Sequence, residues 1–206
     1  MIFDPAVFLL LLAAALIAFV SVYLLRRANA AQAAAWAAFA RSHGMSMSPR
    51  GLRIEGTYEG LPLTVEARYV RAGRGTYVAA VLRLNVAALL PPEFSLEREG
   101  LGDKALRLVG KGDPEIGDAR FDALFDLKSL SPATASVLRH KGVQEHLYEL
   151  ARAYTAFRIR DGWIEAEQRM VPSTEEELEA FTGPALMLAL TLEQAQQERS
   201  LGSAPS

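Results

Sequence analysis

The residues best suited to acid–base chemistry in this chain are Asp118, Asp122 and His146. A hydrolase-like site would need these side chains to converge on one pocket, within hydrogen-bond reach of the reacting atom. The sequence has no G-x-S-x-G or S-x-x-K signature of a nucleophilic serine. We therefore expect a non-enzymatic protein, and keep a membrane-anchored enzyme with a site near these three residues as an alternative.

Metal-binding residue types are scattered along the chain. The three histidines, at positions 43, 140 and 146, form no H-E-x-x-H motif, and there is no cysteine to supply thiolate ligands or disulfides. The acidic residues between Asp113 and Asp126 lack the spacing of a calcium-binding loop. We expect neither a metal nor another cofactor.

Three arginines, Arg68, Arg71 and Arg74, surround a Gly-rich segment that the sequence predicts to be the turn of a β-hairpin. The pattern Gly73-x-Gly75 is not typical of a phosphate-binding loop, because no helix is predicted to follow it. One interpretation of the three arginines is an ordinary solvated turn. The other is a weak contact site for anionic lipid or a protein partner.

The net charge of −2 gives no overall basic field, so we expect no nucleic-acid partner. The charge is nevertheless unevenly distributed. Nine arginines face three glutamates between Arg26 and Arg83, and the rest of the chain beyond Arg83 is acidic. Attraction of the first half to anionic headgroups is one explanation of this asymmetry, and chance is the other.

The segment Ala6–Leu25 holds twenty residues without a charge. As a helix it would be about 30 Å long, which is the thickness of the hydrocarbon core of a bilayer. A cleaved signal peptide is the alternative, with Ala28-Asn29-Ala30 as its cleavage site. No Lys or Arg precedes the apolar run, and the run exceeds the usual length of a signal core. We therefore predict a single transmembrane anchor, with the bilayer as its partner.

The flanks of this anchor predict its orientation. Asp4 lies on the N-terminal side, and Arg26 and Arg27 follow on the C-terminal side. Because positive residues stay on the cytoplasmic side, we expect the N-terminus outside and the following domain in the cytoplasm.

An Ala-rich stretch continues the helix past the membrane to about Ser42, and Gly44 is the signal for its end. Trp36 and Phe39 share one face of this stretch and should dock it onto the domain. An alternative use of the stretch is self-association, because the small residues Ala30, Ala34 and Ala38 recur every fourth position.

The remaining chain alternates between strand and helix patterns. The dipeptide Asp161-Gly162 predicts a two-residue hairpin turn, which pairs Arg158 with Glu165. Ser173 and Glu176 form a predicted capping box for the last helix, whose apolar stripe should cover the sheet. The expected fold class is α+β: an N-terminal transmembrane helix followed by a mainly antiparallel β-sheet with helices on one face.

The segment between these elements is less defined. Residues 121–127 alternate as a strand would, and a helical turn that joins Phe121 with Phe125 is the competing interpretation. Ser131-Pro132 predicts the start of a short helix that ends near Arg139. A second helix is expected over residues 142–153.

The block Gly117-Asp118-Ala119-Arg120-Phe121-Asp122-Ala123-Leu124-Phe125 resembles one found in uncharacterised bacterial single-pass membrane-anchored proteins. The order of elements over residues 113–190 is similar as well. The resemblance implies no activity and no catalytic residues. It implies a strand near residues 121–127, a bacterial origin and, with the anchor, a place in the inner membrane.

These patterns divide the chain into an anchor at 1–27, an Ala-rich juxtamembrane helix at 28–43, a domain at 44–199 and a disordered tail at 200–206. The function expected from them is a membrane-tethered binding or scaffold domain. The second alternative, beside the enzyme, is an accessory subunit of a larger membrane complex.

Overall fold

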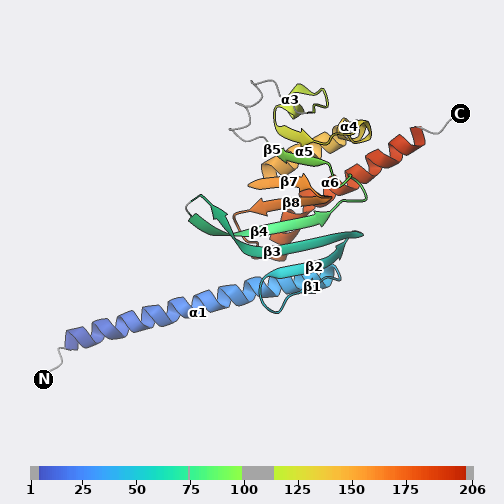
Figure 1. Cartoon of the computed structure of the whole chain (residues 1–206). Coiled ribbons are helices and arrows are strands. Elements are labelled where there is room, and N and C mark those ends of the chain that lie inside the picture. Colours follow the sequence, from blue (N-terminus) through green and yellow to red (C-terminus); the bar gives the residue numbers. More distant parts are fainter. Residues whose placement is uncertain (1–4, 74, 99–113, 203–206) are drawn as a thin grey trace.

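The computed structural model describes residues 5–73, 75–98 and 114–202 (Figure 1). Arg74 and the segments 1–4, 99–113 and 203–206 lie outside the described residues. The described part begins with α1, one continuous helix over Pro5–Ser42. It is the one described helix that is long and apolar enough to cross a membrane, with a mean hydropathy of 2.4 in its most apolar stretch.

After α1 in the sequence, the described strands form one eight-stranded sheet in the order β1-β2-β3-β4-β8-β7-β5-β6 (Figure 1). Every neighbouring pair in this sheet is antiparallel. The strands are β1 (Ser46–Met47), β2 (Arg53–Tyr58), β3 (Leu61–Ala72), β4 (Gly75–Asn85), β5 (Ser95–Arg98), β6 (Phe125–Lys128), β7 (Ala156–Arg160) and β8 (Trp163–Gln168).

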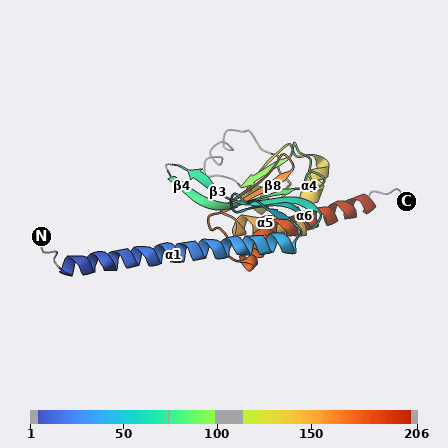
Figure 2. The ribbon, with the colours of Figure 1, turned by 90° about the horizontal axis from the view of Figure 1, so that it is seen from below.

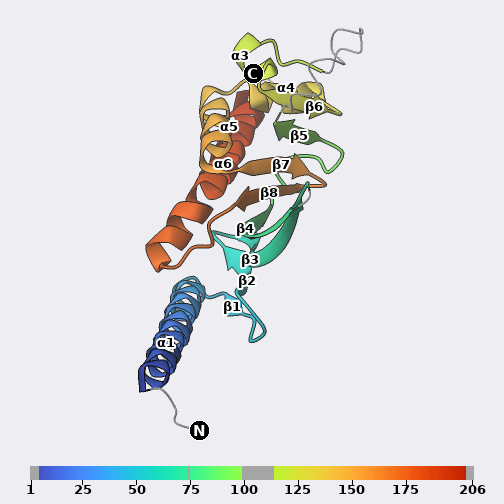
Figure 3. The ribbon, with the colours of Figure 1, turned by 90° about the vertical axis from the view of Figure 1, so that its left-hand side faces the viewer.

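The helices of the domain lie on one face of the sheet, as Figure 3 shows for α5 and α6. After α1 the described helices are α3 (Ala119–Asp122), α4 (Pro132–Leu138), α5 (Lys141–Ala153) and α6 (Glu175–Gly202). The core lies between the two layers, and the stripe expected on the last helix is buried in it through Leu178, Phe181, Ala185, Leu188 and Leu192. The expected α+β fold, with an antiparallel sheet and helices on one face, is therefore confirmed.

The C-terminal part of α1 is itself a component of this core. Trp36 and Phe39 are fully buried. The indole Nε1 of Trp36 donates a hydrogen bond to the carbonyl oxygen of Pro172 at 2.9 Å, and Nε2 of Gln32 donates to the same oxygen at 3.0 Å. Pro172 lies between β8 and α6, so the predicted docking of the Ala-rich stretch through Trp36 and Phe39 is confirmed.

A polar cluster fixes the end of α1 to β2 and α6. His43 lies 3.1 Å from Glu179 of α6, and the hydroxyl of Tyr58 donates to the same carboxylate at 3.0 Å. The rings of His43 and Tyr58 pack with their centroids 4.2 Å apart. Burial, together with the hydrogen bond to Glu179 and its charge, raises the pKa of Tyr58 to about 12.

Several local predictions are confirmed. The β7–β8 hairpin has the predicted register, with Arg158 opposite Glu165. Helix α4 starts after Ser131, whose side chain accepts from the backbone amide of Thr134. Residues 121–127 combine both interpretations, because α3 contains Phe121 and the strand β6 begins only at Phe125.

Two local predictions differ from the structure. The cap of α6 is shifted by one residue: the backbone amide of Glu177 donates to Oγ1 of Thr174, and the carboxylate of Glu177 accepts from Ser173. The predicted pair Ser173 and Glu176 is therefore wrong by one position. Helix α6 also extends to Gly202, so residues 200–202 are helical where a tail was expected.

We predict that Trp36→Ala lowers the free energy of unfolding by about 3–5 kcal/mol, as truncation of a buried aromatic side chain does. The measurement is urea unfolding of the detergent-solubilised chain, followed by circular dichroism. The matched control is Trp163→Ala, because Trp163 is only half-buried and lies on the face of the sheet that none of the described helices covers, called the helix-free face below. Equal losses in the two variants would contradict the docking role of Trp36.

Candidate functional site

The β3–β4 hairpin extends past the helix layer. Its strands stay paired from Leu63 and Leu84 to Ala72 and Gly75. Figures 1 and 2 show that the turn of this hairpin and the N-terminal part of α1 leave the domain toward the same side. The hairpin and the apolar helix therefore point in one direction.

The helix-side face of this hairpin changes character along its length. Ala80 is fully buried in the core. The next pair outward on that face is Tyr69 opposite Val78, and these side chains are 80% and 40% exposed. An aromatic and an aliphatic side chain thus lie side by side in solvent, beyond the region that the helices cover.

The arginines predicted to form one basic tip are divided between the two faces. Side chains alternate along a strand, so Arg71 shares the face of Tyr69 and Arg68 lies on the opposite face. Nη1 of Arg68 is 3.4 Å from Oε1 of Glu66. Arg74 lies outside the described residues. The predicted cluster is therefore not assembled by Arg68 and Arg71.

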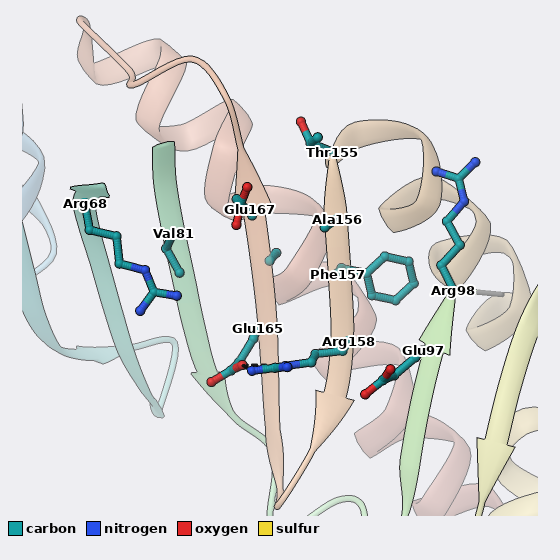
Figure 4. A pocket seen from close by; sticks show the side chains of 11 residues that line it. Arg68, Val81, Glu97, Arg98, Thr155, Ala156, Phe157, Arg158, Glu165 and Glu167 are labelled. Carbon is teal, nitrogen blue, oxygen red and sulfur yellow. Dashed lines mark hydrogen bonds and ion pairs between the residues drawn. The ribbon is translucent and has the colours of Figure 1, made fainter. Parts of the chain in front are cut away.

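The opposite, helix-free face of the sheet carries a groove of about 460 Å³ (Figure 4). We call it the sheet-face groove. Within the described residues, β5 pairs with β7 through Leu96 with Ile159 and Glu97 with Arg158, and the groove lies over this junction and the neighbouring strands β3, β4 and β8. The groove is lined by equal numbers of positive and negative side chains: Arg68, Arg98, Arg158, Glu97, Glu165 and Glu167.

A row of alternating charges crosses four strands beside this groove. The register places Arg83 opposite Glu165, Glu165 opposite Arg158, and Arg158 opposite Glu97. Nε of Arg83 is 2.9 Å from Glu165, and Nε of Arg158 donates to the same carboxylate at 2.7 Å. The guanidinium of Arg83 also lies over the ring of Trp163, 4.9 Å from its centroid.

Glu165 is the electrostatic centre of this row. Its partial burial alone would raise the pKa of the carboxyl. The hydrogen bond from Arg158 and the positive charges of Arg158, Arg83 and Arg68 outweigh that effect, and the pKa of Glu165 is lowered from its usual value of 4.5. The carboxylate is therefore ionised at neutral pH and holds the two strands on either side of it.

The residues proposed for an enzymatic site have structural partners. Oδ1 of Asp118 accepts hydrogen bonds from the backbone amides of Arg120 and Phe121, and thereby caps α3. Asp122 is a buried residue, 7% exposed, and its carboxylate accepts from the backbone amides of Ile116 and Gly117, both at 3.0 Å. Asp118 and Asp122 thus stabilise the loop and the helix start in which they lie.

The third of these residues, His146, lies on α5, where Nδ1 is 2.8 Å from Glu149. None of Asp118, Asp122 and His146 lines the sheet-face groove. Within the described residues, no group of three or more His, Asp or Glu side chains is arranged to hold a metal ion.

A second, apolar groove of about 720 Å³ runs between α1 and the segment that joins β1 to β2. Ala33, Ala34 and Ala37 line it on the side of α1, and Met47 and Leu52 line it on the other side. Of the three alanines expected to form a helix–helix seam, Ala30 and Ala34 are exposed and Ala38 is half-buried. The first two positions of that seam are thus left open by the domain.

Local reasoning from the sequence found Arg158 and Glu165 but not Arg83 or Glu97. The hairpin turn at Asp161 and Gly162 pairs the first two residues directly, whereas the others depend on strands that are distant in the chain. The available signal was the single charged position in the otherwise apolar stretch of β4 around Arg83.

We predict a pH-dependent effect of Arg158→Gln on the free energy of unfolding. Because Glu165 has a lowered pKa in the folded chain, its ion pair stabilises the fold above pH 4.5 and loses this contribution as the pH falls through the folded value. The variant should therefore be less stable than wild type at pH 7, and the difference should shrink in acid. Denaturant unfolding at a series of pH values measures it.

The control for this experiment is Arg160→Gln, on the same strand and the same face. Arg160 is exposed and contacts Asp161 at 3.4 Å, an arrangement that contributes little to stability. A constant difference between wild type and Arg158→Gln at all pH values would contradict the role of Glu165.

Comparison of the chain with protein-family models, curated proteins and solved structures found no match. The resemblance of the block from Gly117 to Phe125 therefore stays a prediction. The function must be argued from the geometry of the chain itself.

Proposed function

We propose that this chain is a membrane-tethered, non-enzymatic binding or scaffold domain that acts at the membrane surface. The observation that carries the proposal is the dual role of α1. Its first part, from Leu9 to Leu25, is an apolar helix whose side chains are all exposed, and its last part, around Trp36, belongs to the core of the domain. A membrane anchor of this kind holds the domain as a rigid body next to the bilayer.

The binding surface in this proposal is the helix-free face of the sheet with its groove. A binding site formed by strands of one rigid sheet is well positioned, and its balanced charges favour a polar partner over a strongly acidic or basic one. Arg158 and Glu165 face each other at the centre of this surface (Figure 4). A protein partner at the membrane surface is the occupant that we favour.

The location in the proposal is the bacterial inner membrane, with a single span and the domain in the cytoplasm. Arg26 and Arg27, directly after the apolar segment, support this orientation. The bacterial origin rests on the resemblance of the block around Phe121.

An accessory subunit of a larger membrane complex is the second candidate function. The exposure of Ala30 and Ala34 on the juxtamembrane part of α1 favours it, because small residues let another helix approach closely. The enzyme alternative has no such observation in its favour among the described residues, since Asp118 and Asp122 cap backbone amides.

We predict that a tag placed after Ser206 captures a partner from the native membrane in a fixed ratio to the chain. Arg158→Gln should lower recovery of this partner severalfold, because it removes a charge from the sheet-face groove. Arg160→Gln, on the same strand but outside the groove, should leave recovery unchanged. Equal recovery with both variants, or no partner in a fixed ratio, would contradict the proposed binding surface.

The orientation gives a separate prediction. The tag after Ser206 should resist added protease in intact spheroplasts and become accessible only after lysis, because the arginines at the end of the anchor keep the domain in the cytoplasm. A periplasmic protein of known orientation serves as the digestion control. Cleavage of the tag in intact spheroplasts would reverse the assigned orientation.

A further inference from the structure

The outer end of the β3–β4 hairpin presents a small surface formed by Tyr69, Val78 and Arg71, which we call the hairpin surface. Tyr69 and Val78 are directly opposite each other, and Arg71 is the next residue outward on the same face of β3. Tyr69 is the most exposed of the large apolar side chains in the described part of the chain. Covering Tyr69 and Val78 would remove apolar surface from water, which is energetically favourable.

The chemistry of these side chains matches a bilayer interface. A tyrosine ring has an apolar body and a polar hydroxyl, and it is enriched at the level of lipid headgroups for this reason. A neighbouring valine adds apolar area, and an arginine pairs with lipid phosphate through several N–H donors. Helix α1 has a similar pair of a tyrosine and an arginine, because Tyr23 and Arg26 lie three residues apart, on the same side of the helix.

The dimensions of the two elements place this surface near the membrane. Residues 28–35 of α1, between the paired arginines and the first core residue Trp36, span about 12 Å at 1.5 Å per residue. The hairpin beyond Ala67 is about 17 Å long at 3.3 Å per residue. Both elements leave the domain toward the same side (Figure 1), so the hairpin is long enough to reach the headgroup level.

We propose that Tyr69, Val78 and Arg71 contact the headgroup layer of the same bilayer that α1 spans. The domain then has two points of membrane contact, the helix and the hairpin, and these fix its rotation about the axis of α1. The inference rests on the proposed function, because only a chain anchored through α1 holds the hairpin against that bilayer. Arg68 takes no part, since it lies on the face of the sheet-face groove.

The absence of native cysteine allows the test in the full chain, with one copy in each lipid nanodisc. A nitroxide at Val78→Cys leaves Tyr69 and Arg71 in place. The control label is Thr57→Cys, an exposed strand position near the β2–β3 turn, at the opposite end of β3. Collision rates of each label with oxygen and with a water-soluble nickel complex report its depth.

In discs that contain anionic phosphatidylglycerol, the ratio of oxygen to nickel collisions should be severalfold higher at position 78 than at position 57. Adding Tyr69→Ser or Arg71→Ser should lower the ratio at position 78, and discs of neutral phosphatidylcholine should weaken the effect of Arg71. Equal, water-like ratios at both positions would overturn the inference. A joint fall of both collision rates at position 78 would also overturn it, because that pattern indicates contact with protein.

A distance measurement in the same discs separates this inference from the proposed function. Labels at Ala30→Cys in α1 and Thr57→Cys in β2 should give one narrow distance distribution if α1 holds the domain rigidly. A narrow distribution together with a water-exposed label at position 78 would contradict the hairpin contact and leave the proposed function intact. A broad distribution contradicts the rigid anchor and, with it, the proposed function.

Discussion

The burial of Trp36 is the interaction on which the arrangement of this molecule depends. Its indole is enclosed in the core and donates its only N–H to the carbonyl of Pro172, which joins the sheet to α6. Because Trp36 belongs to the same unbroken helix as the apolar segment, no flexible linker separates the domain from that segment. This docking contact, together with buried Phe39 and the cluster of His43, Tyr58 and Glu179, sets the direction of the sheet, the hairpin and the open groove relative to that helix.

Much of this fold could be predicted from the sequence because its signals are local. The dipeptide Asp161-Gly162 takes positive φ at both positions, so the turn sets the register of β7 against β8 without reference to the rest of the chain. The buried stripe of α6 and the docking residues of α1 likewise follow from helical spacing. The cap of α6 is the instructive exception, because Ser173 and Thr174 are both good capping residues and the structure uses Thr174.

The candidate surfaces depend on pairings between distant strands, which local patterns do not encode. Arg83 meets Glu165 because β4 lies next to β8, and Glu97 meets Arg158 because β5 lies next to β7. Strand alternation would have separated Arg68 from Arg71, yet the composition of the turn suggested one basic cluster. Asp118 and Asp122, in the block around Phe121, were candidates for acid–base chemistry by residue type. In the structure their carboxylates instead accept hydrogen bonds from backbone amides.

In the proposed membrane-tethered arrangement, the continuity of α1 also ties the domain to the thickness of the membrane. A transmembrane helix that is longer than the local hydrocarbon core tilts to accommodate the mismatch. A helix that ends inside a packed core transmits this tilt to everything attached to it, because the core has no hinge at which to absorb the rotation. In that proposed arrangement, the angle of the sheet to the bilayer is therefore set by lipid chain length as well as by the residues of the domain.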